Sequence, residues 1–458
     1  MKFSIFILIF VMASNLALSA SAKDTFIDAL VSAYNTSGLL DQNRAVLRAA
    51  DEDVATAASQ LAPVISWASS VSHSGSDSSS FDTSASISLS ADYTVYDGGK
   101  SNLGLEAAKF SVLATRSKLI NIEQNVLFEA VTAYLGVIRE TENVALRKNN
   151  LSVIREELKA ANDRFEVGEI TKTDVALAEA RLAASNSALA VAKGSYEKAV
   201  ASYISAIGEN PNSLEYPSFV PKVPDTLENA IAIALTEHPS IDELKNLIKV
   251  SEINLKIADL ATGFTISFGS SVSLDEEGES SGELSISASG PIFSGGKLYS
   301  SSRKKIALNE QALARLYTSK ISIEQNVTNA FSSLQVAKAA KSAAEEQIRA
   351  TEVALKGVKE EAVLGARTTL DVLNAEKDLL DARVQLISAK VDEQLSMYRL
   401  LSQIGRLNAD YLKLPVRQYD VKQYYDLVKG SPASKTKSGR DLDKLLKSLT
   451  KNKPYKAN

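Results

Sequence analysis

The sequence predicts an internally duplicated α+β chain in which four β-strands are inserted between sets of long helices. Three observations lead to this fold class. Sequence landmarks recur in the same order at spacings of 197 to 201 residues, two helical patterns are exceptionally long, and short serine-rich segments alternate polar with apolar residues. A helical pattern of such length favours a coiled coil, and strict alternation favours a strand with two different faces.

The chain opens with the features of a secretory signal peptide over residues 1–22. Lys2 supplies a basic start, an apolar run extends from Phe3 to Val11, and Ala20-Ser21-Ala22 forms a small-residue cleavage site. The apolar run is too short to cross a membrane as a helix. We therefore expect the mature protein to begin at Lys23, outside the cytoplasm.

Composition excludes several classes of site. The 458 residues contain no cysteine, which excludes disulfides and thiolate zinc sites. His73 and His238 lie far apart in the sequence and predict no metal site. The formal net charge of -4 gives no indication of nucleic-acid binding. No nucleophile–base pair is evident, so the sequence predicts neither an enzyme nor a cofactor.

Repetition at a nearly constant offset indicates that the chain is duplicated. The strand exit Tyr96-Asp97-Gly98-Gly99-Lys100 returns as Phe293-Ser294-Gly295-Gly296-Lys297, an offset of 197 residues. The pentapeptide Ile122-Glu123-Gln124-Asn125-Val126 returns unchanged as residues 323–327, an offset of 201. The step of four is close to one helical turn, so the side chains keep nearly the same face.

This duplication predicts the domain organisation. A proline-rich stretch separates the two copies, and the last 28 residues hold eight Lys or Arg against two Asp, which favours a largely flexible basic end. A short amphipathic helix through Leu442, Leu445, Leu446 and Leu449 is the alternative for that end. The predicted segments are a signal peptide over 1–22, a first repeat over 23–208, a linker over 209–225, a second repeat over 226–415 and a periplasmic tail over 416–458.

Each repeat is expected to contain a helix, a strand hairpin, a long helix, a glycine turn and a further helix. The proline of His238-Pro239 would mark a break within the opening helix of the second repeat. Each long helix would be a rod of roughly 100 Å. The first repeat has expected helices over 24–61 and 101–166 and strands over 64–71 and 83–96; the second has helices over 226–261 and 297–363 and strands over 265–274 and 283–292.

The four strands indicate a membrane sheet shared between chains. Serine and threonine occupy one face, which suits a watery lumen, and apolar side chains occupy the other, which suits lipid. Four strands cannot close a barrel, since the smallest outer-membrane barrels have about eight; three chains would supply twelve. The alternative is a small soluble sheet that caps a coiled coil. The apolar face includes Ile87, Leu89, Ile266, Phe268 and Ile286.

Each long helix ends in a turn that contains glycine and is followed at once by another helix. The turns read Phe-Glu-Val-Gly-Glu-Ile-Thr-Lys-Thr-Asp-Val over 165–175 and Ala-Val-Leu-Gly-Ala-Arg-Thr-Thr-Leu-Asp-Val over 362–372. Glycine supplies a left-handed cap for the incoming helix. Asp174 and Asp371 lie where an acid in the first turn favours the helix dipole. Capping alone could account for both aspartates.

These motifs together resemble the TolC family of outer-membrane efflux proteins. The resemblance rests on the Gly-Gly-Lys strand exits, on V-G-x-x-x-x-T-D-V and on G-x-R-T-x-x-D-V-L, and it covers residues 24–415. It implies a homotrimer with a twelve-stranded transmembrane β-barrel in the outer membrane of a Gram-negative bacterium. A coiled-coil tunnel would continue through the periplasm as an exit duct for type I protein secretion, multidrug efflux or both.

The resemblance also implies roles for the two glycine turns, which would form the periplasmic entrance. Ala362 and Asn374 depart from a tyrosine and a second acid found in some members, so the closing clamp and the cation binding should be weaker here. The implied closing contacts are Thr173, Asp174 and Arg367, with Asp371 as a ring of three carboxylates facing the pore. The implied adaptor contacts are Val167, Gly168, Leu364 and Gly365.

The partners implied by the resemblance are a periplasmic adaptor (membrane fusion) protein, an inner-membrane pump of the ABC or RND type, and outer-membrane lipid. The sequence does not distinguish secreted proteins from drugs as cargo. A structural periplasmic coiled-coil protein, or the adaptor itself, is the alternative without pore activity.

Overall fold

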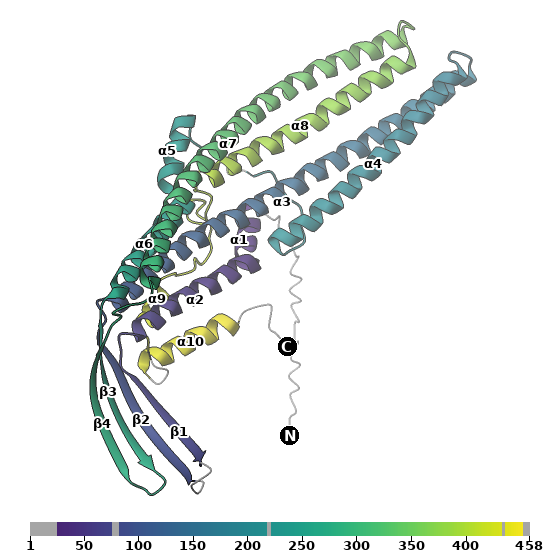
Figure 1. Cartoon of the computed structure of the whole chain (residues 1–458). Helices are drawn as coiled ribbons and strands as arrows, with labels where there is room; N and C mark the ends of the chain where they lie inside the picture. The colour runs from purple at the N-terminus through teal and green to yellow at the C-terminus, as the bar shows by residue number, and fades with distance from the viewer. Residues whose placement is uncertain (1–24, 76–81, 218–220, 433–435, 452–458) are drawn as a thin grey trace, which may run out of the picture.

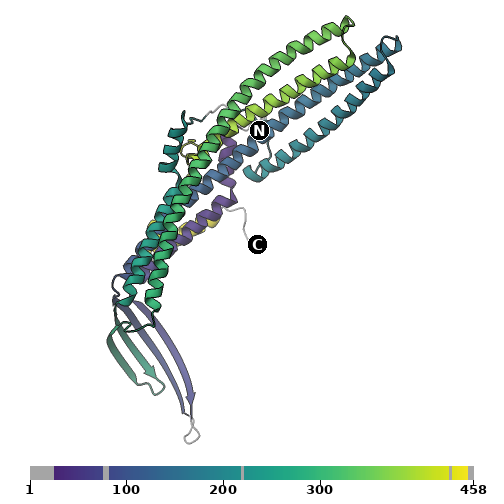
Figure 2. The ribbon, with the colours of Figure 1, turned by 45° about the horizontal axis from the view of Figure 1, so that its top comes forward.

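The computed structural model describes residues 25–75, 82–217, 221–432 and 436–451. The predicted signal peptide lies outside these ranges. The chain forms a long bent rod, with a β-sheet at one end and two helical hairpins at the other (Figures 1 and 2). Sheet and hairpin tips are thus separated by the whole length of the molecule.

The two repeats have matching elements, and their long helices contain 67 residues each. No helix within the described ranges is both long and apolar enough to span a membrane. The first repeat comprises α1 (Phe26–Thr36), α2 (Gly38–Ser59), β1 (Val64–Ser74), β2 (Asp82–Tyr96), α3 (Lys100–Glu166) and α4 (Lys172–Ile207). The second comprises α5 (Leu227–Glu237), α6 (Pro239–Asp259), a 3-10 turn (Leu260–Thr262), β3 (Thr265–Asp275), β4 (Ser280–Ser289), α7 (Lys297–Val363) and α8 (Thr369–Gln403), and α9 (Gln423–Val428) and α10 (Lys437–Lys451) follow.

Each expected opening helix is in fact two helices. In the second repeat the break falls at His238-Pro239, as predicted, because proline starts a helix well and cannot continue one. In the first repeat, the expectation of one helix over 24–61 is wrong. Ser37 has extended backbone, and its side chain accepts a hydrogen bond from the N–H of Leu40, so it caps a new helix.

The sheet is antiparallel with the order β1-β2-β3-β4, so β1 and β4 are its edges. One face carries rows of serines, such as Ser66 opposite Ser90, whose hydroxyls lie 2.8 Å apart. The other face carries apolar side chains, such as Trp67 opposite Leu89. The predicted two-faced sheet is therefore confirmed. The last strand covers 280–289 instead of the expected 283–292, because Gly290-Pro291 follows and proline has no N–H to donate.

The main core lies midway along the rod, where α1, α2, α5 and α6 pack on the long helices and on the segment after α8. Phe26 is at its centre, with its ring 5.2 Å from that of Tyr134 and 5.3 Å from that of Tyr398. Burial of aromatic rings of this kind contributes about 1.5–3 kcal/mol each. The hairpins beyond this core bury a narrower stripe rich in alanine, including Ala161, Ala178, Ala344 and Ala382.

The C-terminal segment differs from the largely flexible tail that the sequence predicts. Within its described part, α9 packs against α2 and α10 packs against α9, and Ala55, Tyr424 and Val428 form a small buried cluster. The Tyr424 hydroxyl donates to Glu52 at 2.5 Å. The apolar stripe of the short helix α10 packs on this cluster, which a pattern within the tail alone could not reveal. The side chains of this stripe that pack on the cluster are Leu442, Leu445 and Leu446.

One carboxylate, that of Asp51 in α2, is buried in this central region without a hydrogen bond. Its side chain has 0% exposure, and neither oxygen has a hydrogen-bond partner. Burial raises its pKa from 3.8 to about 6, although the positive charge of Arg116 acts in the opposite direction. The folded chain therefore holds a proton on Asp51 at pH values where the unfolded chain has lost it.

Asp51→Asn should raise stability near neutral pH and flatten its pH dependence. Because the pKa of Asp51 is raised in the folded chain, Asp51 does not destabilise the fold below about pH 4. The destabilisation grows between about pH 4 and pH 6 and is complete above about pH 6. The shift corresponds to a gain on the order of 2–3 kcal/mol at pH 8. Thermal unfolding of the detergent-solubilised protein near pH 4 and pH 8 measures it, with the exposed Asp53→Asn as control. Equal responses of the two variants would contradict the prediction.

Candidate functional site

The turn between α3 and α4 is closed by a left-handed glycine cap. Gly168 has a φ of 77°, and its N–H donates to the carbonyl of Phe165 at 3.0 Å. The N–H of Glu169 donates to the carbonyl of Arg164 at 2.9 Å. These two bonds satisfy carbonyl groups that the end of a helix leaves without partners. The turn is therefore fixed by backbone geometry, and glycine is the residue that adopts this φ at little cost.

The turn between α7 and α8 repeats this geometry. Gly365 has a φ of 78° and donates to the carbonyl of Ala362 at 3.1 Å, and Ala366 donates to that of Glu361 at 2.9 Å. The two tips are thus structurally equivalent, as the duplication predicts. They lie next to each other at the end of the rod that is farthest from the sheet (Figure 1).

The two aspartates predicted at the entrance are engaged in capping boxes. Thr171 donates its backbone N–H to Asp174 at 2.9 Å, and Thr368 donates likewise to Asp371 at 2.9 Å. Each aspartate N–H in turn faces the threonine hydroxyl. The hydrogen bonds from Thr171 lower the pKa of Asp174, and those from Thr368 lower that of Asp371. Both groups are therefore ionised at neutral pH, and their capping role is confirmed.

The residues predicted to close the entrance do not meet within one chain. Thr173 and Asp174 belong to one tip and Arg367 and Asp371 to the other. Arg367 donates from Nε to the carboxylate of Glu361 at 2.7 Å, within its own turn. Its guanidinium is half exposed and remains accessible from outside the chain.

Apolar side chains project from both tips into solvent. The exposed fractions are 71% for Val167, 84% for Leu364 and 77% for Val363. In a single soluble protein such side chains would ordinarily be scattered or covered. Here they surround Gly168 and Gly365, so both tips present an apolar surface on a rigid turn.

Sequence reasoning missed the polar contacts that join the two hairpins just behind the tips. Lys359 of α7 lies 3.9 Å from the carboxylate of Glu157 on α3 and also pairs with Glu376 on α8. Arg181 of α4 donates to the side-chain oxygen of Asn374 on α8 at 2.8 Å. These pairs come from different helices, so no spacing along the chain reveals them.

Ala362 borders a groove of about 220 Å³ between the two hairpins, together with Glu157 and Lys359. A small side chain at this position leaves the space open. Beside the groove the hairpins share a small apolar cluster, which holds them together within the chain. Its buried members are Ile154, Ala161, Ala178 and Leu373.

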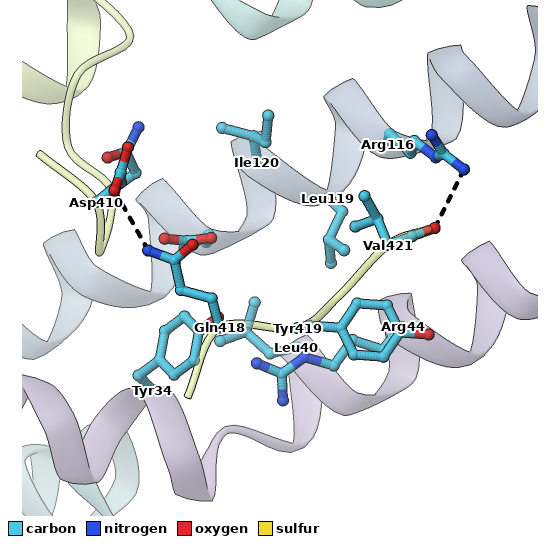
Figure 3. A pocket seen from close by; sticks show the side chains of 12 residues that line it. Tyr34, Leu40, Arg44, Arg116, Leu119, Ile120, Asp410, Gln418, Tyr419 and Val421 are labelled. Atoms are coloured by element: carbon cyan, nitrogen blue, oxygen red, sulfur yellow. Dashed lines mark hydrogen bonds between the residues drawn. The ribbon is translucent and has the colours of Figure 1, made fainter. Parts of the chain in front are cut away.

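A second pocket, of about 330 Å³, lies between α2, α3 and the segment after α8 (Figure 3). The Arg44 guanidinium is 5.0 Å from the ring centre of Tyr34 and 5.7 Å from that of Tyr419. Arg116 donates to the carbonyl of Val421 at 3.1 Å. These cations hold the C-terminal segment against the rod, so the pocket is an anchoring region. No group of three or more His, Cys, Asp or Glu in the described ranges could hold a metal ion.

Known proteins share the sequence features and the fold described above. The model of the family described as outer membrane efflux protein matches residues 30–209 and 257–406. The outer membrane efflux protein BepC of Brucella suis is 33% identical over 90% of this chain and 91% of its own length. The alkaline protease secretion protein AprF of Pseudomonas aeruginosa is 24% identical over 64% of this chain and 63% of its own. The outer membrane channel CmeC of Campylobacter jejuni has the same fold, with a TM-score of 0.76, 15% identity and coverage of 89% and 90%.

Proposed function

Because the chain belongs to the outer membrane efflux protein family, we propose that three copies form a tunnel that opens at the tips of the helical hairpins. The protein is an outer-membrane channel subunit for efflux or secretion, with its helical rod in the periplasm. The observation that carries the proposal is the two-faced sheet, which is hydroxyl-rich on one side and apolar on the other. Its two edges have no neighbouring strand in the described part of the chain.

The sheet supports a trimer. An edge strand leaves a row of backbone groups unpaired, and such groups must be satisfied in lipid. Joining β1 of one chain to β4 of the next removes both edges, and three chains give the twelve strands of a closed barrel. The apolar side chains would then face lipid and the serines the lumen; Trp67 and Ile286 are 75% and 77% exposed on the apolar face.

The gate would form where tips of neighbouring subunits meet. Thr173 and Asp174 of one tip would contact Arg367 of the next, and three copies of Asp371 would line the pore. Both aspartates are ionised and held in place by their capping boxes, so each offers a fixed negative charge to the cation. Exposed ion pairs are weak individually. A partner could therefore open this gate with a modest number of contacts.

That partner would be a periplasmic adaptor protein, coupled to an inner-membrane pump of the ABC or RND type. Val167 and Leu364 are exposed apolar residues, and Gly168 and Gly365 allow close backbone approach. Such surfaces suit the helical hairpin of another coiled-coil protein. A Leu364→Cys variant that never cross-links to the adaptor expressed with it would contradict this assignment.

Electrical recording of the purified protein in a planar bilayer tests the channel itself. We expect a small and stable conductance, because the wild-type gate is closed for most of the time. Well-folded oligomers that give no conductance would favour a structural coiled-coil protein without a pore. Recording with each candidate adaptor then shows whether the partner raises the conductance.

A further inference from the structure

The end of α8 is held by two side chains of α3 within the same chain. Gln124 donates from Nε2 to the carbonyl oxygen of Gly405 at 3.0 Å, and Glu123 accepts from the N–H of Ala409 at 2.7 Å. Gln124 is only 3% exposed. The recurring pentapeptide of residues 122–126 thus clamps the end of the neighbouring hairpin.

The end of α4 has the same local structure as the end of α8. Gly208 and Gly405 both have positive φ, 89° and 85°. Each lies against the break between the two opening helices of its own repeat: a Cβ atom would be 2.9 Å from Thr36 Oγ1 at Gly208 and 2.9 Å from His238 Cα at Gly405. The two helix ends are therefore equivalent in backbone conformation and in what they pack against.

Within the described residues, no side chain of the second copy of the pentapeptide, residues 323–327 on α7, forms a hydrogen bond to a helix end in this way. Glu324 and Gln325 are exposed. Figures 1 and 2 show the long helices in the order α7, α8, α3, α4, with α4 and α7 at opposite borders of the rod. Val327 is 0% exposed and Val126 is 5% exposed, both in the main core, so the two pentapeptides have the same rotation about their helix axes.

We propose that Gln325 of one subunit clamps the end of α4 of the next, donating to the carbonyl of Gly208 as Gln124 donates to that of Gly405. The partner is a second copy of this chain, because only a copy brings an α4 end to α7. The inference rests on the trimer proposed above and adds to it a subunit contact at the level of the main core. The proposed contact of Gln325 with Gly208 between two chains is thus the equivalent of the contact of Gln124 with Gly405 within one chain.

Cross-linking tests this contact, and a chain without cysteine makes it simple. The test pair is Gln325→Cys with Glu209→Cys, treated with a short bismaleimide. We expect covalent dimers and trimers on a denaturing gel. The matched pair Gln124→Cys with Arg406→Cys should react within single chains and give monomers only.

A third pair, Ile321→Cys with Glu209→Cys, lies one helical turn away and fixes the register. The two strand exits are 197 residues apart, and at that offset Ile321 is the equivalent of Gln124. The two pentapeptides are 201 residues apart, and at that offset the equivalent is Gln325. Stronger cross-linking at 321 than at 325 would overturn the proposal. Native oligomers without any covalent product from the test pair would overturn it too, but leave the trimer intact. A protein that is monomeric by light scattering would instead refute the proposed assembly.

Discussion

The Arg367→Ser variant should conduct several-fold more current in a planar bilayer than the wild-type protein. Arg367 is the cation at the proposed contact between tips, and it carries its charge on a half-exposed side chain next to Glu361. Serine removes the charge and leaves Asp174 and Asp371 ionised, because their capping threonines keep their pKa values low. Carboxylates of three subunits would then repel one another, and the closed state would lose its attraction and gain a repulsion.

The matched control for this experiment is Arg349→Ser. Arg349 is also an exposed arginine of α7 and pairs with Glu346, but it lies well before the turn. It should leave the conductance unchanged. If Arg367→Ser behaves like the control, the gate is held by other residues, and the bridge of Lys359 to Glu157 and Glu376 becomes the next candidate.

Gly405→Ala should greatly reduce the amount of folded trimer. A left-handed φ costs about 1–2 kcal/mol for a residue with a Cβ atom. The new Cβ would also lie 2.9 Å from His238 Cα and 3.0 Å from Pro239 Cδ, atoms that no side-chain rotation can move. Overpacking of this kind costs about 1–3 kcal/mol more. The shift would also disturb the bond from Gln124 to the Gly405 carbonyl.

Gly278→Ala separates the two contributions to this effect. Gly278 has a similar φ of 82°, but no atom lies within 4 Å of its would-be Cβ. It should therefore show only the cost of the backbone conformation. Thermal unfolding and the yield of trimer in the outer-membrane fraction measure both variants. Equal losses would mean that the close approach to the helix break is unimportant.

The long helices could be predicted almost to the residue, because glycine pairs mark their starts and the glycine turns mark their ends. The predicted helix over 101–166 is α3, which begins one residue earlier. The break at Ser37 could not be predicted in the same way, since no proline marks it. Its cap is a single serine, in a sequence that contains many serines outside helix ends. The packing of α9 on α2 brings together segments far apart in the sequence, which no local pattern reports.

In the candidate site, too, local features could be predicted from the sequence, whereas contacts between distant segments could not. The sequence predicts an acid in the first turn of α4 and of α8, and the structure shows that each aspartate forms a capping box with the threonine three residues before it. The pairs Lys359 with Glu157 and Arg181 with Asn374 depend on how two hairpins lie together, so they needed the structure. The proposed closing contacts depend on a neighbouring subunit and are not contained in a single chain at all.

The open edges of the sheet have a consequence for the life of the protein before assembly. An unassembled subunit presents two rows of unsatisfied backbone groups and a continuous apolar face, a combination that promotes aggregation. In the proposed assembly, pairing of these edges with neighbouring subunits would therefore have to accompany insertion into lipid. A weakened subunit contact anywhere along the rod would then lower the amount of inserted protein before it changed the conductance of any channel.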